Sequence, residues 1–282
     1  EQIKSIKPDI IYASATGLGA TGPDYMRPGQ DLLMQARSGL VSVTGGEHPT
    51  VIGAAVVDQH GASILAMGIL GALIKKLQTG EGSRVETSLL QSAIDLQTEA
   101  LTKYFARSTT GDVTKRGKNV GSWYHDAPYG AYCLVDCNIV LSMNDPYRLA
   151  DALNSDVLQK LANIDRYLER EKYASAVAKE LEKRTLADVA ERFEDAGIWF
   201  EKIQSYDELL EDPQLKHIGA FIEHKIGDRT VRLVSHPIKY DGVCPKIETI
   251  PLQHGVDTRD ILLEIGMKDN QIDKLIKDGI IA

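Results

Sequence analysis

The chain has 282 residues, a formal net charge of −8 at pH 7 and a pI near 5.4. This length predicts one large or two moderate globular domains with enough residues to bury a core. The acidic balance argues against a nucleic-acid-binding protein, because a phosphate backbone is bound by clustered Lys and Arg.

The first hundred residues alternate between strand-like and helical patterns. Residues 9–14 form an apolar run that predicts a buried strand, and residues 30–40 have helical spacing. Residues 62–74 predict a buried helix, which at 13 residues is shorter than the ~20 residues required to span a bilayer. Residues 84–89 predict a strand, followed by a helix over 90–106. The alternation indicates an α/β fold. The shortness of the helix at 62–74 predicts that the chain has no membrane segment.

The second half begins with a polar, glycine-rich stretch at 108–121, which predicts a linker. The patterns that follow predict a hairpin over 131–143 turning near 136–138, helices at 145–153, 165–183 and 186–196, a strand at 230–237, and helices at 258–265 and 270–277. The three cysteines, an odd number without metal-ligand spacing, predict reduced thiols, a cytoplasmic location and no metal site.

The run Gly17-Leu-Gly19-Ala-Thr-Gly22 fits the three-glycine pattern of a dinucleotide-binding loop. A phosphate-binding loop leads directly into a helix whose amino terminus faces the pyrophosphate. Here Pro23 and a turn-rich stretch to Gly29 intervene. The context therefore argues against an NAD site.

The run Val51-Ile-Gly-Ala-Ala-Val-Val-Asp58 brings a carboxylate from a strand-like stretch to the start of the apolar helix. An acid at such a junction can be an N-cap, whose side-chain oxygen accepts a hydrogen bond from a free amide. It can also be a reactive group. The residues alone leave both interpretations open, and His60, two positions on, does not face Asp58 on a helix.

Several motifs in order resemble those of family III CoA-transferases, the group that includes formyl-CoA transferase, carnitine CoA-transferase and 2-methylacyl-CoA racemase. They are Tyr12-Ala-Ser-Ala-Thr-Gly17, Thr21-Gly-Pro-Asp24, the stretch from Arg27 to Gly45, Asp58, Thr79-Gly-Glu-Gly-Ser-Arg, Pro128-Tyr-Gly, Ala196-Gly-Ile, Asp212-Pro-Gln and Pro251-Leu. Each motif is weakly specific, but the series covers nearly the whole chain. The run at 253–258 departs from the family, which has Gly-Glu-His-Thr there.

The resemblance implies that Asp58 is a covalent nucleophile. A carboxylate is ionised at neutral pH and needs no general base, and partial desolvation would increase its reactivity. Its attack on an acyl-CoA thioester gives an aspartyl anhydride and then an aspartyl-CoA thioester. Gly53 and Gly61 are candidates for the backbone that approaches the oxyanion. Coenzyme A is a co-substrate, with no tightly bound cofactor.

Three residues upstream are assigned to the CoA site by the same resemblance. Gln30 stands where the racemases have a histidine, and because an amide cannot exchange a proton, transfer is favoured over racemisation. Asp31 matches an acidic position near the nucleophile, although it could also cap the helix that follows it. Arg27 could face a CoA phosphate or lie in an exposed turn.

Trp123 and His125 resemble the loop that borders the acyl group, although aromatic packing would explain them equally well. The resemblance further implies a Rossmann-like large domain with its opening part missing, a smaller α+β domain, and an interlocked homodimer that binds acyl-CoA and a carboxylic acid. The expected divisions are a large α/β domain at 1–107, a linker at 108–121, a small α+β domain at 122–225 and a segment at 226–282 that returns to the large domain.

Three other functions remain open. An acyl-CoA racemase or epimerase of the same family would exchange an α-proton with solvent. A non-catalytic subunit would fold or dimerise without forming a covalent adduct. A nicotinamide enzyme would bind NAD.

Overall fold

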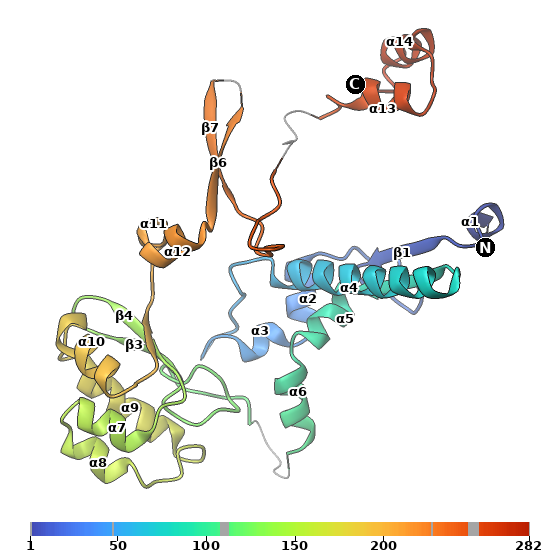
Figure 1. Cartoon of the computed structure of the whole chain (residues 1–282). Coiled ribbons are helices and arrows are strands. Elements are labelled where there is room, and N and C mark those ends of the chain that lie inside the picture. The colour runs from blue at the N-terminus through green and yellow to red at the C-terminus, as the bar shows by residue number, and fades with distance from the viewer. Residues whose placement is uncertain (1, 47, 108–112, 227, 248–253, 282) are drawn as a thin grey trace. The chain divides into compact units, whose positions relative to one another are not determined.

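The computed structural model describes residues 2–46, 48–107, 113–226, 228–247 and 254–281 (Figure 1). Contacts divide the chain into two compact units, Glu1–Ile203 and Gln204–Ala282. This division differs from the domain boundaries expected from the sequence. The return of residues 226–282 to the large domain stays a prediction.

The first part of unit 1 has the expected α/β alternation. Its elements are α1 (Gln2–Ile6), β1 (Ile11–Thr16), α2 (Asp31–Arg37), α3 (Leu40–Val43), α4 (Val56–Thr79), β2 (Ser83–Ser88), α5 (Leu89–Asp95) and α6 (Thr98–Phe105). Strands β1 and β2 pair in parallel, from Ile11 opposite Ser83 to Thr16 opposite Ser88. Parallel neighbours require a crossover, and α4 supplies it. The start of α4 therefore lies toward the carboxyl ends of the strands.

Helix α4 is longer than the sequence pattern predicted. It has 24 residues, ends at Thr79 and is followed by the C-cap Gly80, whose φ of 75° is left-handed. Among the residues that the structure describes, it is the one helix with the length and apolar composition to cross a membrane, so the expectation that this helix is too short to do so was wrong. The absence of a membrane segment stays a prediction. However, α4 contacts β1, β2, α2 and α5, as does a helix that covers a sheet.

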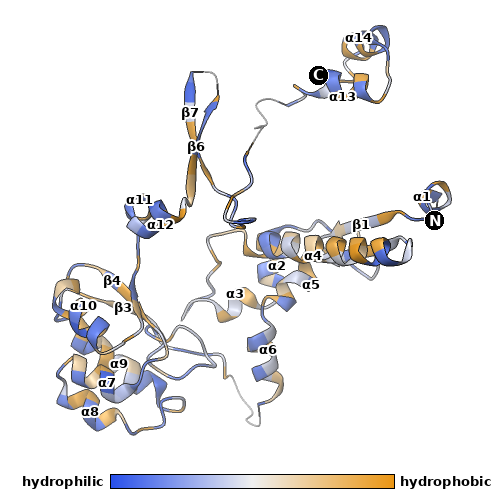
Figure 2. Ribbon diagram, in the orientation of Figure 1, coloured by the Kyte–Doolittle hydropathy of each residue, from blue (hydrophilic) through white to orange (hydrophobic). Residues whose placement is uncertain are grey.

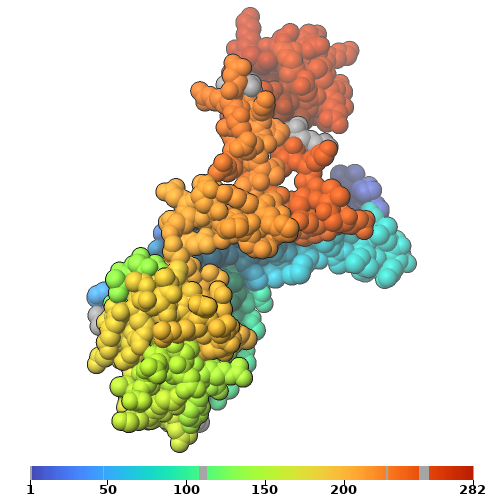
Figure 3. Space-filling view, turned by 60° about the vertical axis from the view of Figure 1, so that its left-hand side comes forward, coloured from blue at the N-terminus to red at the C-terminus, as the bar shows by residue number. Residues whose placement is uncertain are grey.

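The outer face of α4 carries exposed apolar side chains, among them Met67, Leu70 and Leu77. The helix is largely in hydrophobic colours in Figure 2, and part of it lies at the surface in Figure 3 (cyan). The inner face comes close to the sheet at Gly68, where a Cβ atom would lie 2.7 Å from Val85 Cγ1. A larger residue at position 68 would therefore require the Val85 side chain or the helix to shift.

Two local expectations were wrong. Residues 51–55 are not a strand, because α4 begins at Val56 and the segment before it is irregular. The single helix expected over 90–106 is two helices, α5 and α6, separated by Leu96 and Gln97. Buried Gln97 donates to the carbonyl oxygens of Ala93 (2.8 Å) and Ser38 (3.3 Å), which fixes this break.

The second part of unit 1 contains its largest hydrophobic core. An antiparallel sheet of β3 (Gly130–Cys133), β4 (Asn138–Leu141) and β5 (Phe200–Lys202) packs with α7 (Pro146–Ala152), α8 (Asp156–Leu161), α9 (Arg170–Leu181) and α10 (Leu186–Asp195). The predicted hairpin is confirmed as β3 and β4, with Cys133 opposite Asn138. The residues 108–112 of the predicted linker lie outside the described residues.

Two tyrosine hydroxyls in this core, those of Tyr132 and Tyr173, have no hydrogen-bond partner in the described part of the chain. Burial raises the pKa of Tyr173 to about 12, against about 10 in an unfolded chain. The unfolded state therefore loses this proton first, so the contribution of Tyr173 to the free energy of unfolding should be steady below pH ~10 and fall between pH ~10 and ~12.

Substituting Tyr173→Phe should keep or raise the free energy of unfolding at neutral pH, because it removes an unpaired buried hydroxyl. It should also make the alkaline loss shallower. Urea unfolding at neutral and alkaline pH measures both effects. A variant that is less stable at neutral pH, with an unchanged alkaline loss, would contradict this account of the core.

Unit 2 is built from short elements. They are α11 (Tyr206–Glu211), α12 (Pro213–Ile218), the antiparallel pair β6 (Phe221–Ile226) and β7 (Arg229–Val234), α13 (Thr258–Glu264) and α14 (Asp269–Lys277). Strand β7 and both terminal helices were expected from the sequence. Strand β6 and helices α11 and α12 were not.

Candidate active site

Asp58 is the third residue of α4 and is exposed. The residue at the N-cap position of this helix is Ala55, which provides no side-chain cap. Within the described residues, the Asp58 carboxylate forms neither a hydrogen bond nor an ion pair. Asp58 is therefore not the cap of α4, and its carboxylate is free to react.

The carboxylate that caps α4 comes from Asp31, at the start of α2. Its Oδ2 accepts hydrogen bonds from the backbone N–H groups of Val57 (2.8 Å) and Asp58 (3.1 Å). These are two of the amides that a helix leaves unpaired at its amino terminus. The alternative that Asp31 caps its own helix was wrong, because the N-cap of α2 is Gln30, without a side-chain hydrogen bond.

A second buried side chain, Gln35, supports this arrangement. Its Nε2 donates to Asp31 Oδ1 at 2.6 Å, and its Oε1 accepts from the N–H of Ile52 at 2.9 Å. Nε2 also lies 3.4 Å and 3.5 Å from the carbonyl oxygens of Ile52 and Ala54. Gln35 thus joins Asp31 to the segment that leads into α4. The sequence analysis missed this residue, although its i,i+4 spacing from Asp31 was visible.

The remaining neighbours of Asp58 leave it accessible. The partial desolvation expected for the nucleophile is not found, since Asp58 is exposed. His60 Nε2 lies 2.8 Å from Asp95 Oδ2 of α5 rather than against Asp58, which agrees with the rejection of a histidine dyad. Water therefore reaches the Asp58 carboxylate in this structure.

The two candidate glycines differ in their surroundings. Gly53 is exposed, with open space where a Cβ atom would lie. Gly61 is the sixth residue of α4, beyond the four amides that lack partners within a helix. A Cβ atom there would lie 3.1 Å from Ser92 Oγ of α5. Gly53 thus has the more accessible backbone, and Gly61 is explained by helix packing.

Arg27 and Gln30 lie in the exposed loop before α2. Arg27 Nη1 is 3.6 Å from Asp24 Oδ1, and Arg37 Nη2 is 2.5 Å from Asp24 Oδ2. The hydrogen bond from Arg37 lowers the pKa of Asp24. A contact between Arg27 and a CoA phosphate stays a prediction.

Trp123 and His125 belong to an aromatic cluster. Trp123 is buried and packs edge to face with Tyr104 and Tyr124. His125 stacks on Tyr129 at 4.1 Å between ring centroids, and its Nδ1 lies 2.5 Å from Ser122 Oγ. Aromatic packing therefore accounts for Trp123, whereas half-buried His125 keeps part of its ring accessible.

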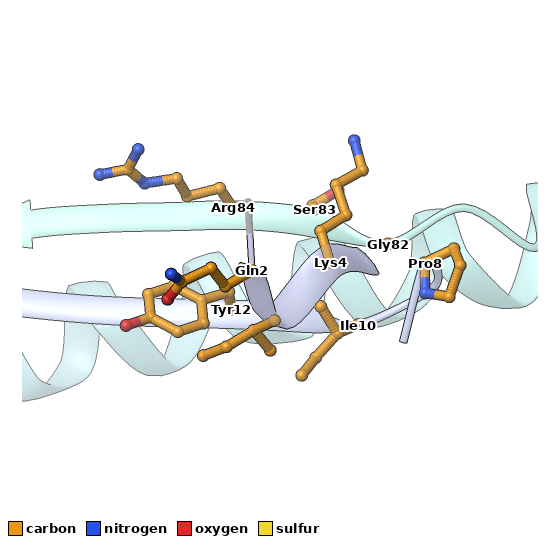
Figure 4. Close-up of a pocket in the computed structure, with 9 residues that line it drawn as sticks. Gln2, Lys4, Pro8, Ile10, Tyr12, Gly82, Ser83 and Arg84 are labelled. Carbon is orange, nitrogen blue, oxygen red and sulfur yellow. The ribbon is translucent and has the colours of Figure 1, made fainter. Parts of the chain in front are cut away.

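Figure 4 shows a pocket of about 460 Å³ whose lining does not include Asp58. It is lined by Gln2, Ile3, Lys4, Pro8, Ile10, Tyr12, Gly82, Ser83 and Arg84. These residues lie near the amino ends of β1 and β2, whereas ligands of parallel α/β sheets bind at the carboxyl ends. Because the 24 residues of α4 span about 36 Å, this pocket and Asp58 are at opposite ends of the helix.

A model of CoA-transferase family III matches residues 1–258. The chain belongs to this family. Curated relatives that are similar to this family III chain include a succinyl-CoA:glutarate CoA-transferase of Mus musculus, 29% identical over all of the chain and 66% of the relative. Another is the (R)-2-hydroxy-4-methylpentanoate CoA-transferase of Clostridioides difficile, 28% identical over 96% of the chain and 70% of the relative.

A solved structure supports the fold of this family III chain. The CaiB/BaiF family protein from Brucella suis superposes with a TM-score of 0.73 and 23% identity, over 93% of this chain and 70% of that protein. The chain spans 66% and 63% of the first two curated relatives, the second being an acyl-CoA transferase of Fusarium pseudograminearum.

Proposed function

We propose that this chain carries the nucleophile of an acyl-CoA:carboxylate CoA-transferase, and that Asp58 is that nucleophile. The observation that carries the proposal is the free Asp58 carboxylate, on a helix whose amino terminus is already capped by Asp31. A carboxylate in the first turn usually helps to cap its own helix. Here that requirement is met from elsewhere, so Asp58 is left for chemistry.

The proposed reaction needs no external acid or base. A carboxylate oxygen of Asp58 attacks the thioester carbonyl carbon, the C–S bond breaks, and an aspartyl anhydride and CoA thiolate form. The thiolate attacks Cγ of Asp58, which releases the first acid and leaves an aspartyl-CoA thioester. The carboxylate of the second acid attacks Cγ, expels the thiolate and forms a second anhydride. The thiolate then attacks the carbonyl carbon that came from the second acid, which gives the new acyl-CoA and restores the Asp58 carboxylate.

Each attack creates a tetrahedral oxyanion near the start of α4. Asp31 occupies the amides of Val57 and Asp58, so these N–H groups are not the donors to that oxyanion. We assign this role instead to the accessible backbone around Gly53, three residues before the helix starts. The interlocked homodimer implied by the resemblance remains a prediction, and light scattering after gel filtration would check whether the particle has the mass of a dimer.

An isotope experiment tests the covalent route. The protein is incubated with succinyl-CoA and with glutarate whose carboxylates are doubly labelled with ¹⁸O. The mass of the peptide that contains Asp58 is then measured by mass spectrometry after digestion. The route above leaves one acceptor oxygen in the Asp58 carboxylate. CoA transfer without label in Asp58 would exclude the anhydride mechanism. If glutarate is not an acceptor, labelled (R)-2-hydroxy-4-methylpentanoate is the second probe.

A further inference from the structure

We propose that Gln35 is a positioning residue that sets the place of Asp58 through two connections, the Asp31 carboxylate and the backbone of Ile52. This inference rests on the proposed function. Gln35 is 1% exposed and lies on α2, and the hydrogen bonds of its side chain go to Asp31, Ile52 and Ala54 rather than to Asp58. Any effect of Gln35 on transfer must therefore pass through the groups that it holds.

The first connection orients Asp31. The two oxygens of this carboxylate have separate partners: Oδ1 accepts from Gln35 Nε2 at 2.6 Å, and Oδ2 accepts from the amides of Val57 and Asp58. With Oδ1 held, the carboxylate cannot rotate about its Cβ–Cγ bond without losing a buried hydrogen bond. The donor on Gln35 thus keeps Oδ2 directed at the amide of Asp58.

The second connection fixes the approach to the helix. Gln35 Oε1 accepts from the N–H of Ile52, and Nε2 lies near the carbonyl oxygens of Ile52 and Ala54. These residues flank Gly53 and precede Val56, where α4 begins. One amide side chain therefore ties together the cap of α4 and the segment that we expect to bind the oxyanion. Only a side chain with both a donor and an acceptor can do so.

The substitution Gln35→Glu tests the first connection, because it keeps the shape and the acceptor but replaces the donor. At alkaline pH, where the introduced carboxyl becomes ionised, it repels Asp31, and kcat should fall about 10²-fold with KM for succinyl-CoA unchanged. Near pH 6 a protonated carboxyl again donates to Asp31. The ratio of variant to unmodified activity should therefore rise as the pH falls.

A matched control is Gln97→Glu. Gln97 is also buried, at 8% exposed, and its Nε2 also donates to oxygen acceptors, but these are the carbonyls of Ala93 and Ser38 and not Asp31. This variant should lose stability without the pH-dependent recovery of kcat. An equal recovery in both variants would overturn the proposal. The variant Gln35→Met, which has no ionisable group, should lose kcat at every pH.

Amide hydrogen exchange supplies a readout that does not depend on activity. In the unmodified protein the amides of Val57 and Asp58 should be protected, and Gln35→Glu should speed their exchange at alkaline pH while those of α10 stay protected. If the unmodified protein transfers no CoA, the proposed function fails. The positioning role is a separate claim, and it fails only if the exchange of the Val57 and Asp58 amides is the same in Gln35→Glu as in the unmodified protein. If transfer occurs and this exchange is unchanged in Gln35→Glu, the positioning role alone is wrong.

Discussion

Replacing Asp58 with asparagine is expected to reduce CoA transfer on the order of 10⁴-fold or more, as when a covalent nucleophile is removed. The amide is nearly the same size as the carboxylate but is a far weaker nucleophile, so the anhydride cannot form. Because Asp58 is exposed and its side chain caps nothing, the free energy of unfolding should change by less than about 0.5 kcal/mol. Steady-state transfer and urea unfolding measure the two effects.

Asp95→Asn is the matched control. It makes the same chemical change at another exposed carboxylate. Asp95 lies on α5 and pairs with His60, which is in the first turns of α4. Transfer should remain close to that of the unmodified protein. If Asp58→Asn kept its activity, the nucleophile would have to lie elsewhere. If both variants lost activity equally, the negative charge near the start of α4 would matter rather than the identity of Asp58.

Replacing Asp31 with alanine should reduce both stability and transfer. Three donors lose their acceptor: the buried amide of Val57, the part-buried amide of Asp58 and the buried Nε2 of Gln35. The loss of a helix cap together with an unsatisfied buried donor should cost about 2–3 kcal/mol. The first turn of α4 would fray, so kcat should fall about 10²-fold through misplacement of Asp58. Thermal unfolding and kinetics of transfer check these expectations.

A second helix cap separates the effect on stability from the effect on chemistry. Thr185 caps α10 and accepts from the N–H of Asp188 at 3.2 Å, in a capping box within the other part of unit 1. Thr185→Ala should lower the free energy of unfolding by about 1 kcal/mol and leave kcat unchanged. An Asp31→Ala variant that unfolds more easily but keeps full kcat would show that Asp31 stabilises α4 without positioning Asp58.

Local patterns predicted much of the fold. The apolar run at the start of β1, the strand predicted at 84–89 and the turn between β3 and β4 each depend on neighbours in sequence, and each was found. The strand-like run before Asp58 was misleading. Its apolar residues precede a helix that can start at Val56 because a carboxylate from α2 caps it. No pattern within residues 51–61 contains that information.

The candidate site was predicted only in part, because some of its contacts join residues that are far apart in the sequence. Asp58 was placed at the start of the long helix, and the structure puts it in the first turn of α4. The helix amides that Asp31 caps are 26 and 27 residues away, so the sequence left its local capping role and a role near Asp58 equally open. Gln35 was overlooked because a glutamine on an apolar helix face gives no signal of its contact with Ile52, 17 residues on.

The most direct test of the central claim is trapping of the activated aspartyl carbonyl. The protein is incubated with succinyl-CoA, quenched with hydroxylamine, digested and mapped by mass spectrometry, with Asp58→Asn alongside. The proposed function predicts a hydroxamate at Asp58 in the unmodified protein and none in the variant. A family III enzyme that reacts under the same conditions serves as the positive control. Transfer of CoA with no modification at Asp58, or a hydroxamate at another carboxylate, would contradict the account.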